Sequence, residues 1–364
     1  MKCWDTLTLL VKPVSADCNI SCAYCFYSPK SLLYPYENHP RMSEETLSVL
    51  TELVLSTGAE NVSIIWQGGE PTLTGLGFYK KAVQLQALYR YPTQKISNSI
   101  QTNGILIDNP WVMFLKNEKW LVGVSLDGDI DQHNAYRLDR GGTGTYSKTR
   151  KALRLLQSEK VPYNILALLN NINVKDPKSL YSDLKKEGHR YLQFIPCIEY
   201  DPDTNEPTNY SITADEYGSF LIEVFDEWIK DIPNVFVRDF EDIMIGEVTG
   251  TSPNCVYSGE CGQYLVVEFN GDVYPCDFYV DHQWVLGNIH EDPIEELFNG
   301  KRFKNFMDKR KLPVQCKSCP WLRYCNGGCQ KHMQIDHNYF CDSYKMFFEY
   351  ADEKIQYMKR NVTR

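Results

Sequence analysis

Three cysteines near the start of the chain have a spacing suited to binding a metal cluster. Cys18, Cys22 and Cys25 lie in CNISCAYC, directly after the apolar run TLTLLVKPV. Iron–sulfur cubanes take thiolate ligands, normally four. Three thiolates would therefore hold three irons and leave the fourth open, and an open position on a metal is where chemistry can occur. The spacing alone also fits a zinc ion that takes a distant fourth ligand.

Eight further cysteines lie between residues 255 and 341. They are Cys255, Cys261, Cys276, Cys316, Cys319, Cys325, Cys329 and Cys341. Eight thiolates fill two four-ligand cubanes with none left over, although one or two zinc sites would also use such spacings. Of the chain's 13 cysteines, this leaves Cys3 and Cys197 without a ligand role. We expect Cys197 to be a buried thiol that fills core space.

Charge and composition exclude several classes of protein. The chain has 364 residues and a net charge of −9, which argues against an extended nucleic-acid footprint. The N-terminal apolar run is too short for a signal peptide, and no run approaches the roughly 20 apolar residues that span a membrane. We therefore expect a cytoplasmic protein that binds neither nucleic acid nor membrane, whose cysteines bind metal rather than form disulfides.

Six short apolar runs in the first 200 residues predict strands that alternate with helices. The strands are expected at 6–14, 61–66, 95–101, 121–127, 163–169 and 191–197. Helices are expected from Ser43, a suitable N-cap, and near 77–90, 146–158 and 176–187. This alternation predicts a parallel α/β fold, either an open sheet or a partial barrel.

The polar motifs fall where these strands end. CNISCAYC, QGGEPT, QTNG, SLDG and PCIEY each follow a predicted strand. Parallel α/β barrels place their active sites at that face. The motifs are therefore expected to meet in one site.

The remaining segments are expected to form two further regions. Residues 201–250 predict a bridging segment with two helices, and residues 251–364 a cysteine-rich domain, after a first domain at 1–200. Within the cysteine-rich domain, alternating apolar residues around Asn270–Gly271 predict a hairpin with a two-residue turn.

The first cysteine group resembles the signature of radical S-adenosylmethionine enzymes. The resemblance rests on C-x3-C-x2-C with Tyr24 before the third cysteine, and on GGEP at 68–71. S-adenosylmethionine carries an amine and a carboxylate that can chelate the open iron, and the reduced cluster can cleave it to a carbon radical. The resemblance implies a partial (β/α)6 barrel.

It also implies the residues that contact the cofactor. These are Tyr24, Gly68, Gly69, Glu70, Ser125, Arg137 and Ile198. The glycines allow close backbone approach, an arginine fork suits the cofactor carboxylate, and Ile198 would lie on the adenine side. The alternative is that these residues make no cofactor contact. Ser125 would then be a serine at the edge of the core, Arg137 a surface arginine and Ile198 a core isoleucine.

The C-terminal cysteines resemble the SPASM extension, which holds two clusters. The resemblance implies interleaved ligand sets: Cys255, Cys261, Cys276 and Cys329 for one cluster, and Cys316, Cys319, Cys325 and Cys341 for the other.

Across nearly the whole chain, the motifs resemble anaerobic sulfatase-maturating enzymes, which convert a cysteine or serine of a sulfatase to formylglycine. LLVKP, QGGEPTL, NSIQTNG, VGVSLDG and VYPCDFYV carry this likeness. It implies that Asp277, next to Cys276, is the catalytic base, although an acid there could also brace the hairpin. Gln67 and Tyr27 are expected to contact the peptide.

The resemblance further implies cofactors and partners. We expect three [4Fe-4S] clusters, S-adenosylmethionine, an unfolded or nascent sulfatase as substrate, an electron donor such as ferredoxin or flavodoxin, and a monomer. Another peptide-modifying radical enzyme, which forms thioethers, carbon–carbon crosslinks or epimers, is the alternative; a zinc-binding protein without enzymatic activity is a third.

Overall fold

The computed structural model describes residues 5–362, which form two compact units. The first unit comprises the described residues up to Ser125 together with Tyr136–Tyr163 and Gly262–Lys309. The second comprises Leu126–Ala135, Asn164–Cys261 and the described residues from Arg310 onward. Cys3, for which the sequence predicted no role, lies outside the described residues.

The first unit is built on a mainly parallel sheet with the order β12-β11-β10-β1-β3-β4-β5. These strands are β1 (Thr6–Lys12), β3 (Asn61–Trp66), β4 (Lys95–Thr102), β5 (Leu121–Ser125), β10 (Leu265–Glu268), β11 (Asp272–Tyr274) and β12 (Gly287–Asn288). The β10–β11 and β11–β12 pairs are antiparallel. A separate antiparallel pair joins β2 (Ile20–Cys22) to β6 (Arg137–Asp139).

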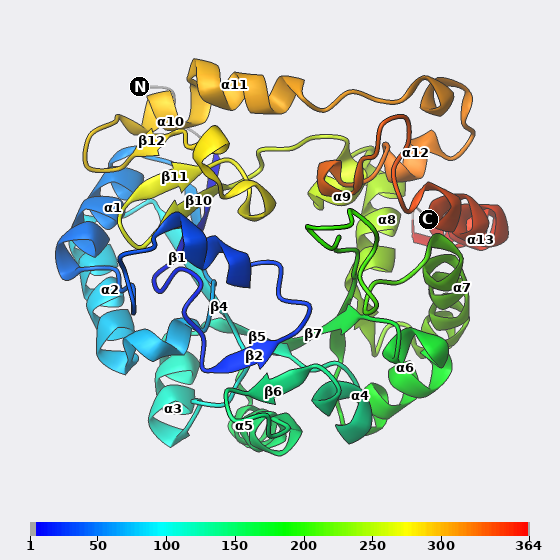
Figure 1. Cartoon of the computed structure of the whole chain (residues 1–364), viewed down its shortest axis with the longest axis horizontal. Helices are drawn as coiled ribbons and strands as arrows, with labels where there is room; N and C mark the ends of the chain where they lie inside the picture. Colours follow the sequence, from blue (N-terminus) through cyan, green and yellow to red (C-terminus); the bar gives the residue numbers. More distant parts are fainter. Residues whose placement is uncertain (1–4, 363–364) are drawn as a thin grey trace. The chain divides into compact units, whose positions relative to one another are not determined.

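Helices flank this sheet (Figure 1). They are α1 (Glu44–Ser56), α2 (Leu76–Tyr89), α3 (Asn109–Asn117), α5 (Tyr146–Ser158), α10 (Ile294–Asn299) and α11 (Lys301–Asp308). The predicted N-cap is confirmed, because the side chain of Ser43 accepts a hydrogen bond from the Thr46 amide at 3.0 Å. This cap stabilises the first turn of α1. The helix then buries one face, which includes Leu47, Leu50 and Val54.

The second unit contains parallel strands and most of the longer helices. Its strands are β7 (Tyr163–Leu169), β8 (Tyr191–Pro196) and β9 (Phe236–Val237). Its helices are α4 (Ile130–Asn134), α6 (Pro177–Lys186), α7 (Ala214–Asp231), α8 (Arg238–Thr249), α9 (Cys255–Ser258), α12 (Leu322–Cys325) and α13 (Cys341–Val362). Aromatic contacts such as Phe225–Phe347, with ring centroids 5.4 Å apart, join α7 to α13.

The six predicted strands of the first 200 residues are confirmed as β1, β3, β4, β5, β7 and β8. The two helices predicted in 201–250 are confirmed as α7 and α8. The hairpin at residue 270 is present, but its two-residue turn was wrong. Val267 pairs with Val273, so the loop spans three residues, 269–271. Gly271, at φ +90°, supplies the left-handed position that a three-residue loop requires.

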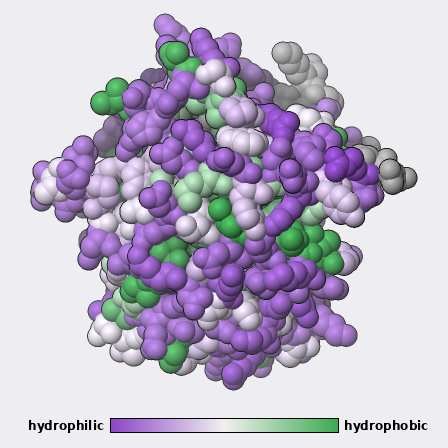
Figure 2. Space-filling model, turned by 90° about the vertical axis from the view of Figure 1, so that its right-hand side faces the viewer, coloured by the Kyte–Doolittle hydropathy of each residue, from purple (hydrophilic) through white to green (hydrophobic). Residues whose placement is uncertain are grey.

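The surface is mostly hydrophilic on the face shown in Figure 2, where hydrophobic residues form small separate patches. Scattered exposed apolar residues of this kind are normal on protein surfaces. Among residues 5–362, no helix combines the length and the apolar composition needed to cross a membrane.

Candidate active site

The first three cysteines lie in a loop and short strand between β1 and the glycine-rich segment. Cys18 lies in the loop, Cys22 ends β2, and the Cys25 amide donates to the Cys22 carbonyl at 3.1 Å. Two of the thiols have nitrogen donors nearby. Asn103 Nδ2 lies 3.9 Å from Cys18 Sγ, and Arg137 Nη1 lies 3.8 Å from Cys22 Sγ. Partly buried sulfurs with such donors suit a negatively charged cluster.

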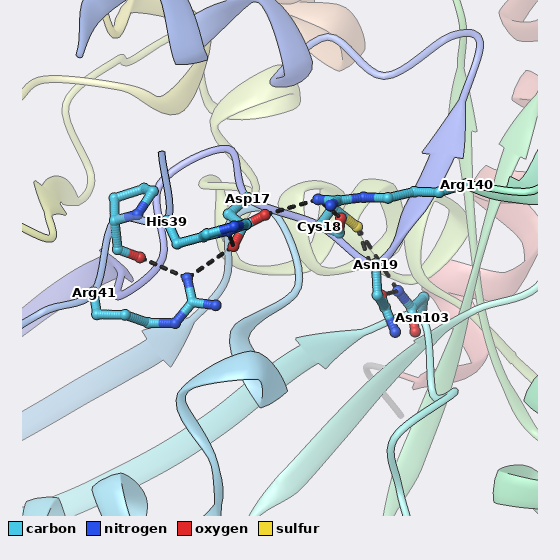
Figure 3. Close-up of polar contacts among 8 residues, drawn as sticks. Asp17, Cys18, Asn19, His39, Arg41, Asn103 and Arg140 are labelled. Atoms are coloured by element: carbon cyan, nitrogen blue, oxygen red, sulfur yellow. Dashed lines mark hydrogen bonds and ion pairs between the residues drawn. The ribbon is translucent and has the colours of Figure 1, made fainter. Parts of the chain in front are cut away.

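Asp17 holds the cysteine loop in place through the side chains of Arg41, Arg140 and His39 (Figure 3). Its carboxylate contacts Arg41 Nη1 at 2.9 Å, Arg140 Nη2 at 2.9 Å and His39 Nδ1 at 3.1 Å. Arg140 also donates to the carbonyl of Cys18 at 2.5 Å. Burial opposes ionisation of Asp17, but the hydrogen bonds from Arg41 and His39 outweigh it and hold its pKa below the ordinary value. Sequence reasoning missed this clamp.

The glycine-rich segment packs directly on the same loop. The amide of Glu70 donates to the Asp17 carbonyl at 2.8 Å. A Cβ atom on Gly69 would lie 1.9 Å from that carbonyl oxygen, so only glycine fits there without a backbone shift. The glycine therefore allows the Asp17 backbone to approach this segment closely. The close approach of a cofactor, which the sequence predicted, stays a prediction.

Glu70 is a structural tie between two strand ends. Its buried carboxylate accepts hydrogen bonds from Thr72 Oγ1 (2.5 Å), Thr102 Oγ1 (2.7 Å) and the Asn103 amide (2.8 Å). Burial raises the pKa of Glu70, although these hydrogen bonds oppose the shift. Because the carboxylate is occupied in this way, a contact between this segment and a cofactor would come from the backbone.

Three further predicted cofactor contacts lie in the first unit. Arg137 is opposite Cys22 in the β2–β6 register, and its guanidinium lies 5.5 Å from the ring centroid of Tyr24. Ser125 ends β5, and its hydroxyl accepts from Gln101 Nε2 at 3.2 Å. The structure therefore brings Tyr24 and Arg137 to the first cysteine group. The short β6 strand that does so was not predicted, because three residues carry too little periodicity.

Ile198 lies in the second unit, where it is buried two residues beyond β8. Cys197, beside it, is buried as expected. The roles predicted for the cofactor contacts stay predictions.

Asp277 follows Cys276 at the start of a short 3-10 helix, Asp277–Tyr279. Each of its carboxylate oxygens has a neighbour. Tyr264 donates its hydroxyl to Oδ1 at 2.8 Å, and the ammonium of Lys12 lies 4.0 Å from Oδ2. The Tyr264 hydroxyl also lies 3.5 Å from Cys276 Sγ. A carboxylate can accept a proton from a substrate group within hydrogen-bond reach, and the base role of Asp277 stays a prediction.

Tyr27, a predicted peptide contact, is buried and belongs to this group. Its hydroxyl donates to Glu268 Oε1 at 2.5 Å, and the Lys12 ammonium lies 4.1 Å from its ring centroid. Burial raises the pKa of Glu268 to about 7. Gln67, the other predicted peptide contact, is half-buried, and its backbone amide donates to the Val11 carbonyl at 2.9 Å. Lys12 and Glu268 were not predicted as site residues.

Four of the C-terminal cysteines line one cavity in the second unit. The cavity has a volume of about 310 Å³, and its lining includes Trp321 and Tyr344. The cysteines are Cys316, Cys319, Cys325 and Cys341. This is the set expected for one four-thiolate cluster, so the residues present fit such a group.

Arg310 connects the segments that carry three other cysteines of the second unit. It donates to the carbonyls of Cys255 (3.2 Å) and Gly328 (2.9 Å), and its Nη1 lies 3.9 Å from Cys261 Sγ. Cys329 follows Gly328 directly. Cys276, the fourth member of the expected set, belongs to the first unit, so that ligand set stays a prediction.

In residues 5–362, no group of three or more histidine, cysteine, aspartate or glutamate side chains is arranged to hold a single metal ion. In a cubane each thiolate binds a different iron, so its ligands are spread around the cluster.

Two family models match the chain. The "Radical SAM superfamily" matches residues 13–184, and SPASM, described as an "Iron-sulfur cluster-binding domain", matches residues 255–320. A cysteine-type anaerobic sulfatase-maturating enzyme of Clostridium perfringens is 38% identical, over 98% of this chain and 99% of the relative. A serine-type enzyme of Bacteroides thetaiotaomicron is 34% identical, over 98% and 92%.

A solved structure agrees with these matches. Native anSMEcpe with bound AdoMet and Cp18Cys peptide is 37% identical to this chain and similar in fold, with a TM-score of 0.91 over 98% of this chain and 99% of that one. The predicted α/β fold with a C-terminal SPASM domain is confirmed. From its sequence and its fold, the chain belongs to the anaerobic sulfatase-maturating enzymes of the radical SAM superfamily.

Proposed function

We propose that this enzyme oxidises a cysteine of a sulfatase to Cα-formylglycine, with serine as the other candidate target. The observation that carries the proposal is Asp277, a carboxylate held at both oxygens next to Cys276, in a chain that belongs to this family. Cysteine is favoured because the cysteine-type relatives are 35–38% identical to this chain and the serine-type relatives 32–34%.

The cofactors proposed are three [4Fe-4S] clusters and S-adenosylmethionine. Cys18, Cys22 and Cys25 would hold the cluster that binds S-adenosylmethionine, and the eight C-terminal cysteines would hold the other two. When bound, these groups supply the carbon radical that removes a hydrogen atom from the substrate Cβ, and an acceptor for the electron lost next.

The chain's own residues would orient the reactants and accept a proton. Arg137 and Ser125 would bind the cofactor carboxylate, the backbone of 68–70 its amine, and Ile198 its adenine. Tyr27 and Gln67 would contact the peptide. Asp277 would accept the proton of the substrate thiol or hydroxyl as the carbon–heteroatom double bond forms. From a thiol the product is a thioaldehyde, which water converts to the aldehyde with release of hydrogen sulfide.

The partners follow from this chemistry. The substrate would be an unfolded or nascent sulfatase segment, and a ferredoxin or flavodoxin would supply electrons to a monomeric cytoplasmic enzyme. We assign radical generation to residues 1–200, the bridge to 201–250 and the two further clusters to 251–364.

Replacing Asp277 by asparagine tests the proposal. The amide keeps the size of the side chain but cannot accept the proton. With the fully reconstituted enzyme and a sulfatase peptide under anaerobic conditions, 5′-deoxyadenosine should still form, while aldehyde formation should fall about 10²-fold. Mass spectrometry of cysteine and serine versions of the peptide would identify the preferred target.

Asp281→Asn is the matched control. Its side chain caps the next short helix by accepting from the Gln283 amide, a role that asparagine also performs. Aldehyde at the wild-type rate from Asp277→Asn would exclude Asp277 as the base. Lost iron in that variant would instead show that Asp277 braces the hairpin, and a crosslinked wild-type product would refute formylglycine formation.

A further inference from the structure

Lys12 is a buried lysine that the proposed reaction does not yet use. It ends β1 in the LLVKP motif, and its side chain is 1% exposed. Its ammonium makes no hydrogen bond to any residue in the described part of the chain. An ammonium removed from water without hydrogen bonds is costly, so nearby negative charge must compensate for it.

Two acidic residues provide that compensation. Asp277 Oδ2 lies 4.0 Å from Lys12 Nζ. Glu268 is the direct partner of Lys12 in the parallel β1–β10 register, so the two side chains lie on the same face of the sheet. Burial lowers the pKa of Lys12, and the attraction of Asp277 and Glu268 opposes that shift. The lysine thus lies among two carboxylates and the face of the Tyr27 ring.

The glycine-rich segment makes room for the lysine stem. A Cβ atom on Gly68 would lie 2.4 Å from Lys12 Cδ and 3.2 Å from Lys12 Cβ. Gly68 also has φ +103°, which side chains rarely adopt. The absent side chain of Gly68 therefore leaves the path along which Lys12 extends toward Asp277.

The carboxylate of Asp277 is consequently held at two points. Tyr264 binds Oδ1 through a hydrogen bond, and Lys12 attracts Oδ2 through charge. Two contacts on opposite oxygens restrict rotation of the carboxylate about its last bond, which a single contact would not do. The longer 4.0 Å separation leaves a lone pair of Oδ2 available to a proton from the substrate.

We propose that Lys12 is a positioning residue for Asp277, which it aligns together with Tyr264 for proton transfer, and that Glu268 remains the counter-ion of Lys12 when Asp277 becomes neutral. This inference rests on the proposed function. The proton moves from the substrate thiol or hydroxyl to Asp277, and Lys12 neither gains nor loses a proton. Glu268 can serve in this way because Tyr27 and Ser15 donate hydrogen bonds to it at 2.5 and 3.2 Å.

A double-mutant cycle between Lys12→Met and Asp277→Asn tests the assignment. Methionine keeps the unbranched stem that fits beside Gly68 but carries no charge. With the reconstituted enzyme and sulfatase peptide, Lys12→Met should lower aldehyde formation roughly 10- to 100-fold, the effect of losing a contact to a charged group. Deoxyadenosine formation and iron content should stay at the wild-type level. In the Asp277→Asn background, Lys12→Met should have no further effect on aldehyde formation.

Lys95→Met is the matched control, because Lys95 is exposed at the start of β4 and pairs with Glu60 on the surface. If Lys12→Met does not fold, Tyr264→Phe takes its place in the same cycle. It removes the contact to Oδ1 and should likewise reduce aldehyde only when Asp277 is present.

The outcomes separate this inference from the proposed function. Unchanged aldehyde in Lys12→Met, or an equal loss in both Asp277 backgrounds, would overturn the assignment while Asp277 remains the base. A parallel loss of deoxyadenosine and aldehyde would show that Lys12 only supports the fold. Full aldehyde formation by Asp277→Asn would refute the base itself and therefore both proposals.

Discussion

Replacing Glu268 by glutamine should change how the stability of the enzyme depends on pH. Burial raises the pKa of Glu268 from its ordinary value of 4.5 to about 7, although Tyr27 and Lys12 oppose the shift. Between these values the folded chain binds more protons than the unfolded chain. Linkage then requires the free energy of unfolding to fall as pH rises through this window, by about 3 kcal/mol in total. Glutamine does not titrate, so the free energy of unfolding of the variant should not show this fall with pH.

The assay compares thermal unfolding of the cluster-loaded wild type and Glu268→Gln under anaerobic conditions. From about pH 4.5 to above pH 7, the wild type should lose about 4 °C in melting temperature relative to the variant, if the chain unfolds as one unit. The comparison at each pH cancels any lability that the clusters confer on both proteins. Glu60→Gln, a change at an exposed carboxylate, should run parallel to the wild type. Parallel curves for wild type and Glu268→Gln, or a wild type that gains stability with pH, would refute the reasoning.

Two further substitutions test the first cysteine group. Gly69→Ala should force the Asp17 carbonyl to move, cost about 1–3 kcal/mol of stability and reduce deoxyadenosine formation. Gly75→Ala is the control, because Gly75 also has a positive φ but has open space around it. An equal effect of both changes would mean that backbone strain alone is responsible. Arg137→Ala should weaken S-adenosylmethionine binding roughly 10- to 100-fold without loss of iron. Exposed Arg154→Ala should leave the dissociation constant unchanged, and an unchanged constant for Arg137→Ala would exclude the carboxylate contact.

Sequence reasoning placed the six parallel strands because each is a short apolar run bounded by polar turns. It placed the polar motifs correctly for the same reason, since they begin where the apolar runs stop. The antiparallel β2–β6 pair escaped it, because its two strands span three residues each and are separated by more than 100 residues of chain. Pairings of that kind depend on tertiary contacts, which local periodicity does not encode.

The site was predicted less completely than the fold. Cysteines and glycines stand out by type and spacing, whereas Lys12 and Glu268 look like ordinary charged residues at strand ends. The roles proposed for them rest on burial and on their pairing across β1 and β10, and both are properties of the folded chain. The signal that could have revealed Lys12 was its position: a lysine at the end of an apolar run that is expected to be buried is unusual unless it has a partner.

The position of β10 explains how Asp277, the proposed base, comes to lie in the same unit as the segment that carries Cys18. Leu265–Glu268 pairs in parallel with Leu9–Lys12, and β11, which leads to Cys276 and Asp277, pairs with Leu265–Glu268 on its other side. A slip of this register by one residue would send Glu268 to the opposite face of the sheet and remove it from Lys12. The slip would break the buried pair, which is costly. The packing of the neighbouring residues Leu10 and Val266 in one core cluster also opposes the slip. The hydrophobic register of the two strands therefore fixes the pairing of Lys12 with Glu268, the proposed counter-ion.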